Sequence, residues 1–169
     1  MVNAHSTFPS APVQPAPARK ASLGAAERFT GRFLNTFAEF EFWMVERLKN
    51  AVPGVKVGKP VGQRLEDLRA ALKHHPEIVR VPNEVDKLLD RLQPYVQLRS
   101  LLAHGRLTAL CGADETIYLF ETPTPLLDDP GKVRIVLRSG EFETLRRGLW
   151  ELIEAFKQQT PEAEARSSP

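Results

Sequence analysis

An arginine and a histidine five positions apart, Arg99 and His104, are the side chains in this sequence with the clearest potential for chemistry. They belong to the segment LRSLLAHGRL at residues 98–107, in which a glycine directly follows the histidine. Arg99 stands within an apolar run, where a charged group is seldom found without a partner. An imidazole can move a proton near neutral pH, and a guanidinium can hold a phosphate through its planar fork of donors. Phosphodiester cleavage without a metal requires these two abilities.

The spacing of the pair limits how the two side chains can meet. The segment is predicted to end an amphipathic helix, and residues five apart on a regular helix diverge by about 140°. Arg99 and His104 therefore converge only if the helix ends between them, or if a second copy of the chain brings its own pair across a two-fold axis. In the second case, two arginines and two histidines would line one polar cleft between the copies.

The string RSLLAHG at residues 99–105 resembles the Arg–four residues–His signature of the HEPN family (higher eukaryotes and prokaryotes nucleotide-binding domains). Many members of that family are metal-independent ribonucleases. The resemblance implies a homodimer of the toxin or defence kind, in which Arg99 and His104 are catalytic and the 2′-hydroxyl of RNA is the nucleophile. It also implies RNA and a protein antitoxin or regulator as partners, with no cofactor and no metal.

Three more residues are expected to support this pair. Ser100 follows the arginine, at a position where active family members usually carry Asn, Asp or His, and its polar side chain can substitute for them. Arg106 stands where members controlled by a nucleotidyltransferase antitoxin carry tyrosine, which argues against that mode of neutralisation. Arg106 can instead reach the RNA backbone. Glu41 is a carboxylate with which Arg99 can pair.

A second interpretation stays open beside the enzyme. A histidine in the last turn of a helix is favoured by the helix dipole whatever the protein does, and an arginine on a helix often pairs with a carboxylate. The same residues are therefore compatible with a non-catalytic helical dimer of the same fold that acts as a binding or regulatory module. RNA cleavage distinguishes the two interpretations.

Composition favours one domain with tails and excludes several classes of protein. The 169 residues are 42% hydrophobic, and 23 basic residues face 21 acidic ones, which is not the balance of a strongly cationic nucleic-acid binder. One cysteine excludes an internal disulfide, and four scattered histidines give no metal-ligand spacing. No apolar stretch approaches a membrane span, so a soluble, cytoplasmic protein is expected. Arg64, Arg69 and Lys73 form either a basic strip or an ordinary solvated helix face.

Periodicity predicts a mainly α fold, a HEPN-like four-helix bundle with a small β-hairpin before the last helix. The helical domain spans residues 24–159, between a disordered Pro- and Ala-rich tail at 1–23 and a second disordered tail at 160–169. Helices are predicted at residues 25–50, 63–73, 82–104 and 141–158, the third with a kink or restart at Pro94. Gly105 is expected to end that helix in the left-handed conformation. Strands at 116–121 and 133–138 would form the hairpin as an appendage on the bundle.

The first predicted helix is apolar on two sides. One stripe consists of Phe29, Phe33, Phe37, Phe40, Met44 and Leu48. A second stripe, on another side, consists of Leu34, Ala38, Phe42 and Val45. A helix with two apolar sides must bury both, and in a domain this small a symmetric dimer is the simplest way to do so. Glu41 falls at the border between the stripes, so a carboxylate is expected at the edge of the interface.

Overall fold

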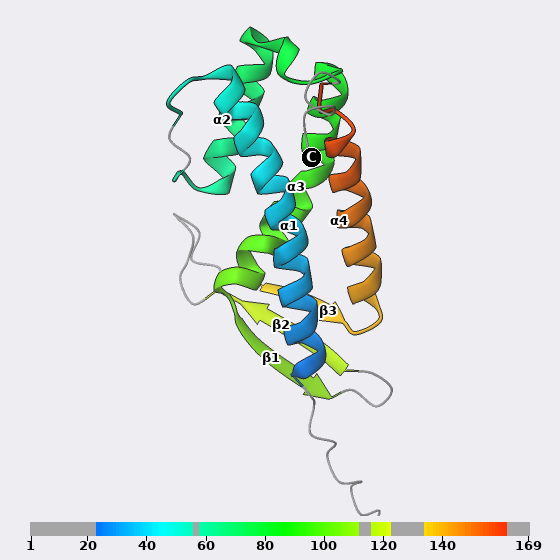
Figure 1. The fold of residues 1–169 in the computed structure, drawn as a ribbon. Coiled ribbons are helices and arrows are strands. Elements are labelled where there is room, and N and C mark those ends of the chain that lie inside the picture. The colour runs from blue at the N-terminus through cyan, green and yellow to red at the C-terminus, as the bar shows by residue number, and fades with distance from the viewer. Residues whose placement is uncertain (1–22, 56–57, 112–115, 123–133, 162–169) are drawn as a thin grey trace, which may run out of the picture.

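The computed structural model describes residues 23–55, 58–111, 116–122 and 134–161, and within them four α-helices and a three-stranded antiparallel sheet form the fold (Figure 1). The helices are α1 (Gly24–Ala51), α2 (Val61–His74), the short 3-10 helix η1 (Pro76–Ile78), α3 (Pro82–His104) and α4 (Glu141–Lys157). The strands are β1 (Arg106–Cys111), β2 (Thr116–Glu121) and β3 (Arg134–Arg138). The chain is mainly helical, and the four predicted helices are confirmed within two residues at each end.

The core is built around the first apolar stripe of α1. Phe33, Phe37 and Phe40 are completely buried, because α1 packs against each of the other three α-helices. Two ring contacts join α1 to α4: Phe29 stacks on Phe142 with ring centroids 4.3 Å apart, and Phe40 lies 4.8 Å from Phe156. Removing one such buried phenylalanine ring from a core typically costs about 3–5 kcal/mol. The stripe therefore decides where α1 sits and which of its sides remains outside.

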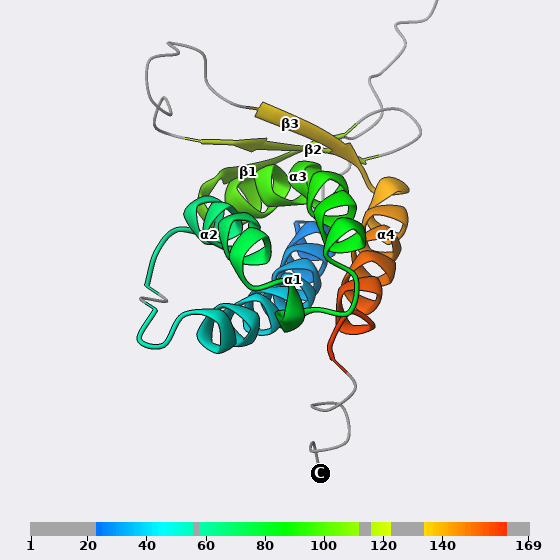
Figure 2. The ribbon, with the colours of Figure 1, turned by 90° about the horizontal axis from the view of Figure 1, so that it is seen from above.

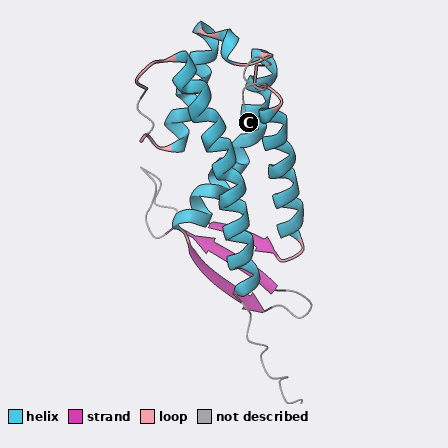
Figure 3. Cartoon of the chain, in the orientation of Figure 1, coloured by secondary structure: helices cyan, strands magenta, loops and turns pink. Residues whose placement is uncertain are grey.

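The predicted hairpin is confirmed as the antiparallel pair β2–β3, but it is part of a larger sheet. A further strand, β1, starts directly after Gly105 and pairs with β2, so the strand order is β1–β2–β3. Tyr118, Phe120 and Leu137 on the inner face of the sheet are buried in the core. The helices all lie on that face of the sheet (Figure 2), and the sheet lies at one end of the helical bundle (Figure 3). The expectation of an appendage was therefore wrong, because the sheet shares the hydrophobic core of the helices.

Helix α3 is continuous from Pro82 to His104, with Pro94 inside it. The predicted restart at Pro94 does not occur, although a proline removes one backbone donor from the helix. Leu92 and Leu98 on either side of it are buried, and this packing compensates for the lost hydrogen bond. As a result, the segment that carries Arg99 and His104 belongs to the same continuous helix as the residues before Pro94.

Both predicted tails lie largely outside the residues that the structure describes. Of the two predicted tails, residues 1–22 and 162–169 lie outside the described residues. Thr160, the first residue of the second predicted tail, accepts a hydrogen bond from Trp43 Nε1 at 3.1 Å. Among the described helices, none combines the length and the apolar character needed to cross a membrane.

Candidate functional site

The two motif residues lie on the same helix but on different sides of it. Because α3 runs unbroken to His104, the rotation of about 140° over five helical residues separates the side chain of Arg99 from that of His104. The first of the two ways in which they could meet, a helix that ends between them, is therefore contradicted. Within one chain the structure does not bring the pair together, and only a second copy could complete the site.

Arg99 forms an ion pair with Glu41, as expected for a charged side chain within an apolar run. Its Nη2 lies 3.2 Å from Oε1 of Glu41, which α1 places opposite this side of α3. The Arg99 side chain is 29% exposed and the Glu41 side chain 19%, so the pair is half-buried and keeps some contact with solvent. The pairing of Arg99 with Glu41 that the sequence left open is present in the structure.

Glu41 also binds a second arginine, which comes from α2. Arg64 Nη2 donates to Glu41 Oε2 at 2.5 Å, and only 12% of the Arg64 side chain is exposed. One carboxylate thus joins α1 to α2 and to α3. We call Glu41, Arg64 and Arg99 the Glu41 cluster. With two guanidiniums and one carboxylate it carries a net charge of +1, in partly buried surroundings where charge interactions are stronger than in water.

Arg64 was missed as a site residue because α2 presents three basic side chains that look alike in the sequence. The interpretation as a basic strip or a solvated face fails for Arg64, because its side chain is largely buried and bonds to Glu41. Its position gives a weak signal in retrospect. Arg64 precedes Leu65 and lies one turn before Leu68, both of which are buried, so it borders the buried face of α2.

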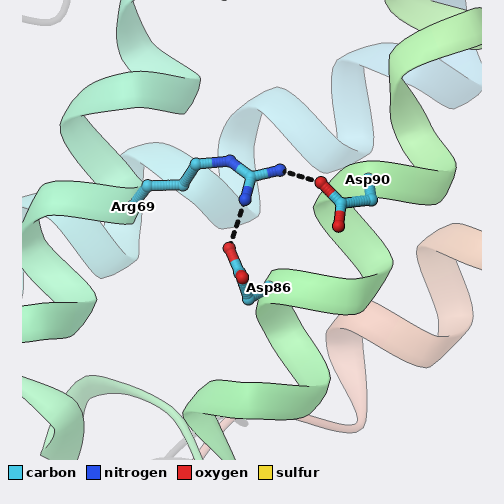
Figure 4. Close-up of polar contacts among 3 residues, drawn as sticks. All are labelled: Arg69, Asp86 and Asp90. Carbon is cyan, nitrogen blue, oxygen red and sulfur yellow. Dashed lines mark hydrogen bonds and ion pairs between the residues drawn. The ribbon is translucent and has the colours of Figure 1, made fainter.

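Arg69 is engaged in a different ion-pair cluster, between α2 and α3. Its guanidinium bonds to Asp86 through Nη1 and to Asp90 through Nη2, the latter at 2.6 Å (Figure 4). These groups are more exposed than the Glu41 cluster, with 30% exposure for Arg69 and 70% for Asp90. Exposed ion pairs contribute about 0–1 kcal/mol each. Arg69 therefore ties two helices together at the surface and is not a free cation for RNA.

His104 is the last residue of α3, and its side chain is exposed. None of the described residues forms a hydrogen bond or an ion pair with it. Because no described residue engages this exposed imidazole, it can act on a group supplied from outside this chain.

The other two supporting residues do not join Arg99. Ser100 is rotated by about 100° from Arg99 on the helix. It lines a cavity of about 600 Å³ between α3 and the sheet, beside Leu101, Thr122 and Ile135. Arg106 is exposed at the start of β1, where it pairs in register with Glu121 of β2. Phe120, the residue before Glu121, is buried in the core. The structure thus gives Ser100 and Arg106 no contact with the Glu41 cluster.

Gly105 ends α3, but not for the predicted reason. Its φ of −80° and ψ of 152° are extended, so the left-handed conformation is contradicted. A Cβ at this position would lie 2.3 Å from the carbonyl oxygen of Leu101 and 3.2 Å from that of Glu121. Glycine is needed chiefly because the last turn of α3 brings its own Leu101 carbonyl too close for any side chain, and the Glu121 carbonyl of β2 is a second close neighbour. This close approach fixes the position of His104, the residue before it.

The second apolar stripe of α1 is not buried in the core, although Leu34 at one end of it packs against the core. Phe42 is 73% exposed, and Leu34, Ala38 and Val45 are only partly buried. Glu41 lies three residues after Ala38 and four before Val45, which puts it at the border of this face. We call Leu34, Ala38, Phe42 and Val45 the outer face of α1. The described part of the chain leaves this face open beside the Glu41 cluster.

Metal ligands and known relatives complete the description. Over the described residues, no group of three or more His, Cys, Asp or Glu side chains could hold a metal ion. Comparison of the chain with protein-family models, with curated proteins and with solved structures gave no match.

Proposed function

We propose that this chain is a HEPN-type endoribonuclease that acts as a homodimer, with Arg99 and His104 of both copies in one cleft. The observation that carries the proposal is the contrast between the two motif residues: Arg99 is held at the border of an uncovered apolar face, and His104 is exposed and has no bonding partner among the described residues. Four helices with a small sheet before the last one agree with a HEPN-like bundle. A toxin or defence role, with a protein antitoxin or regulator as partner, belongs to the same proposal.

The chemistry of the cleft follows from the two side chains. The 2′-oxygen of RNA attacks the adjacent phosphorus, and the P–O5′ bond breaks. The imidazole of one His104 takes the proton from the 2′-hydroxyl, and the protonated imidazole of the other gives a proton to the leaving 5′-oxygen. Arg99 binds the phosphate oxygens, where negative charge builds up in the transition state. The products are a 2′,3′-cyclic phosphate and a 5′-hydroxyl.

Incubation of the purified protein with end-labelled RNA in EDTA tests the proposal. We expect cleavage with fragments that end in a 2′,3′-cyclic phosphate, and no cleavage of an all-2′-deoxy substrate of the same sequence. Cleavage of both substrates, or of neither, would overturn the proposed reaction.

A second candidate function is favoured by one observation, the pairing of Arg99 with Glu41 inside its own chain. If that ion pair is the whole purpose of Arg99, the protein is a non-catalytic helical dimer that binds or regulates a partner. Arg99→Ala would then lower the stability of the protein, and the wild-type protein would cleave no RNA. The EDTA experiment separates the two candidates.

The outer face of α1 supplies a prediction about the dimer. We expect the wild-type protein to have about twice the 19.0 kDa mass of one chain in light scattering, and Phe42→Glu to have the mass of one chain. Two glutamates near a two-fold axis repel each other across a desolvated surface, and such like-charge contacts cost several kcal/mol. Val136→Glu is the control, because Val136 is 57% exposed on β3 and lies on the opposite face of the sheet from the buried Leu137, the face away from the helices. A monomeric wild-type protein, or a dimeric Phe42→Glu variant, would contradict the prediction.

A further inference from the structure

The two arginines of the Glu41 cluster bind different oxygens of one carboxylate, and they bind unequally. Arg64 donates to Oε2 at 2.5 Å, whereas Arg99 approaches Oε1 at 3.2 Å. Arg64 is also the more buried of the two, with 12% exposure against 29% for Arg99. The stronger partner of Glu41 is therefore the arginine that the HEPN-like motif does not contain.

This inequality has a consequence for Arg99. An arginine alone with a carboxylate tends to form a bidentate, fork-to-fork pair, which neutralises both groups and uses two donors. Arg64 occupies one oxygen of Glu41 and offsets its charge. Arg99 is left with a single long contact, and no other described residue bonds to its guanidinium. Most of its donors stay available for an external acceptor, and the cluster as a whole keeps a charge of +1.

We propose that Arg64 is a positioning residue, which engages Glu41 so that Arg99 remains open to a phosphate. The inference rests on the proposed ribonuclease function, because it assigns the phosphate of RNA to Arg99. Without Arg64, Glu41 turns both oxygens toward Arg99 and draws its guanidinium away from the substrate.

Steady-state cleavage of RNA by Arg64→Met and Arg64→Lys tests the proposal. Loss of one charge-assisted contact to phosphate is expected to raise KM about tenfold in Arg64→Met, with kcat changed less than about threefold. Lysine keeps the charge and one donor to Glu41, so Arg64→Lys should recover most of the lost affinity. A KM in Arg64→Lys equal to that in Arg64→Met would overturn the inference.

Arg69→Met is the matched control. Like Arg64, Arg69 is an α2 arginine that bonds to carboxylates on a neighbouring helix (Figure 4), but those carboxylates, Asp86 and Asp90, do not belong to the Glu41 cluster. Both variants lose interhelical ion pairs, so a general loosening of α2 would raise KM in both. We expect KM to stay within about twofold of the wild-type value in Arg69→Met. Equal changes in the two methionine variants would count against a specific role for Arg64.

A measurement that does not depend on cleavage separates this inference from the proposed function. The arginine Nε–Hε signal of Arg99 in a 15N correlation spectrum reports the surroundings of its guanidinium. This signal is expected to shift in Arg64→Met and to keep its position in Arg69→Met. If it shifts while the wild-type protein cleaves no RNA, the positioning role stands and the ribonuclease proposal fails. An unmoved signal in Arg64→Met would refute the positioning role itself.

Discussion

Replacing His104 with alanine is expected to slow RNA cleavage by about 100- to 10,000-fold, the usual contribution of a positioned general acid or base. In the proposed dimer the substitution removes both the base that activates the 2′-hydroxyl and the acid that protonates the leaving oxygen. The folded state should be little affected. His104 is exposed, and surface substitutions usually change the free energy of unfolding by less than about 0.5 kcal/mol. Initial cleavage rates and urea unfolding curves of the same preparations measure both effects.

His74→Ala is the control for this prediction. His74 is also an exposed histidine in the last position of a helix, α2, so it shares with His104 the influence of the helix dipole. A role of His104 in helix stability alone would make the two variants behave alike. A contaminating nuclease would leave the rate unchanged in both. Only a catalytic His104 makes the rate fall in one variant and persist in the other.

The parts of the fold that the sequence predicted are those that local patterns control. The phenylalanines of α1 recur every three or four residues, and this spacing produces one buried stripe wherever the helix packs. The long helix α3 and the pair β2–β3 were predicted from the same kind of pattern. In each case the residues that decide the element lie within one or two turns, or within one strand, of one another.

Strand β1 and the role of Gly105 could not be predicted in this way. The residues of β1 have weak strand propensity, and the strand forms because β2 lies alongside to accept its hydrogen bonds. A glycine after a helix usually suggests a left-handed cap. Here an extended glycine leaves no room for a Cβ beside the Leu101 carbonyl, and the Glu121 carbonyl, sixteen residues further along the chain, becomes a second neighbour only when the sheet docks on α3.

The candidate site shows the same difference between local patterns, which could be recognised in the sequence, and long-range contacts, which could not. Arg99 and His104 were recognised because they stand close together in the sequence. Their separation around α3 depends on whether that helix continues past Arg99, which a proline nearby made difficult to judge. Arg64 was missed because its partner, Glu41, is 23 residues away on another helix. Only the packing of α1 against α2 turns one of three similar basic residues into a member of the cluster.

Gly105→Ala should be among the most destabilising single substitutions in this protein, because the added methyl group meets backbone and not a side chain that can move. Its Cβ would lie 2.3 Å from the carbonyl oxygen of Leu101, the same oxygen that accepts the hydrogen bond from the Gly105 amide at 2.7 Å. Relief requires the backbone in the last turn of α3 to shift, and the Glu121 carbonyl of β2 leaves little room for that shift. We expect a loss of about 3 kcal/mol in the free energy of unfolding, at the upper end of the usual cost of overpacking.

Gly62→Ala is the matched control, since Gly62 lies in α2 and a Cβ there would meet no atom within 4 Å. Alanine in a helix is better than glycine by about 0.5–1 kcal/mol, so this variant should be more stable than the wild type in urea unfolding. Opposite signs for the same chemical change would show that the crowded backbone at the end of α3, and not glycine content, sets the stability. That backbone also holds His104, so Gly105→Ala is expected to lower RNA cleavage even under conditions where the variant is folded. A Gly105→Ala protein as stable as the wild type would mean that the helix end can shift freely, and the exposed position of His104 would then no longer support the proposed site.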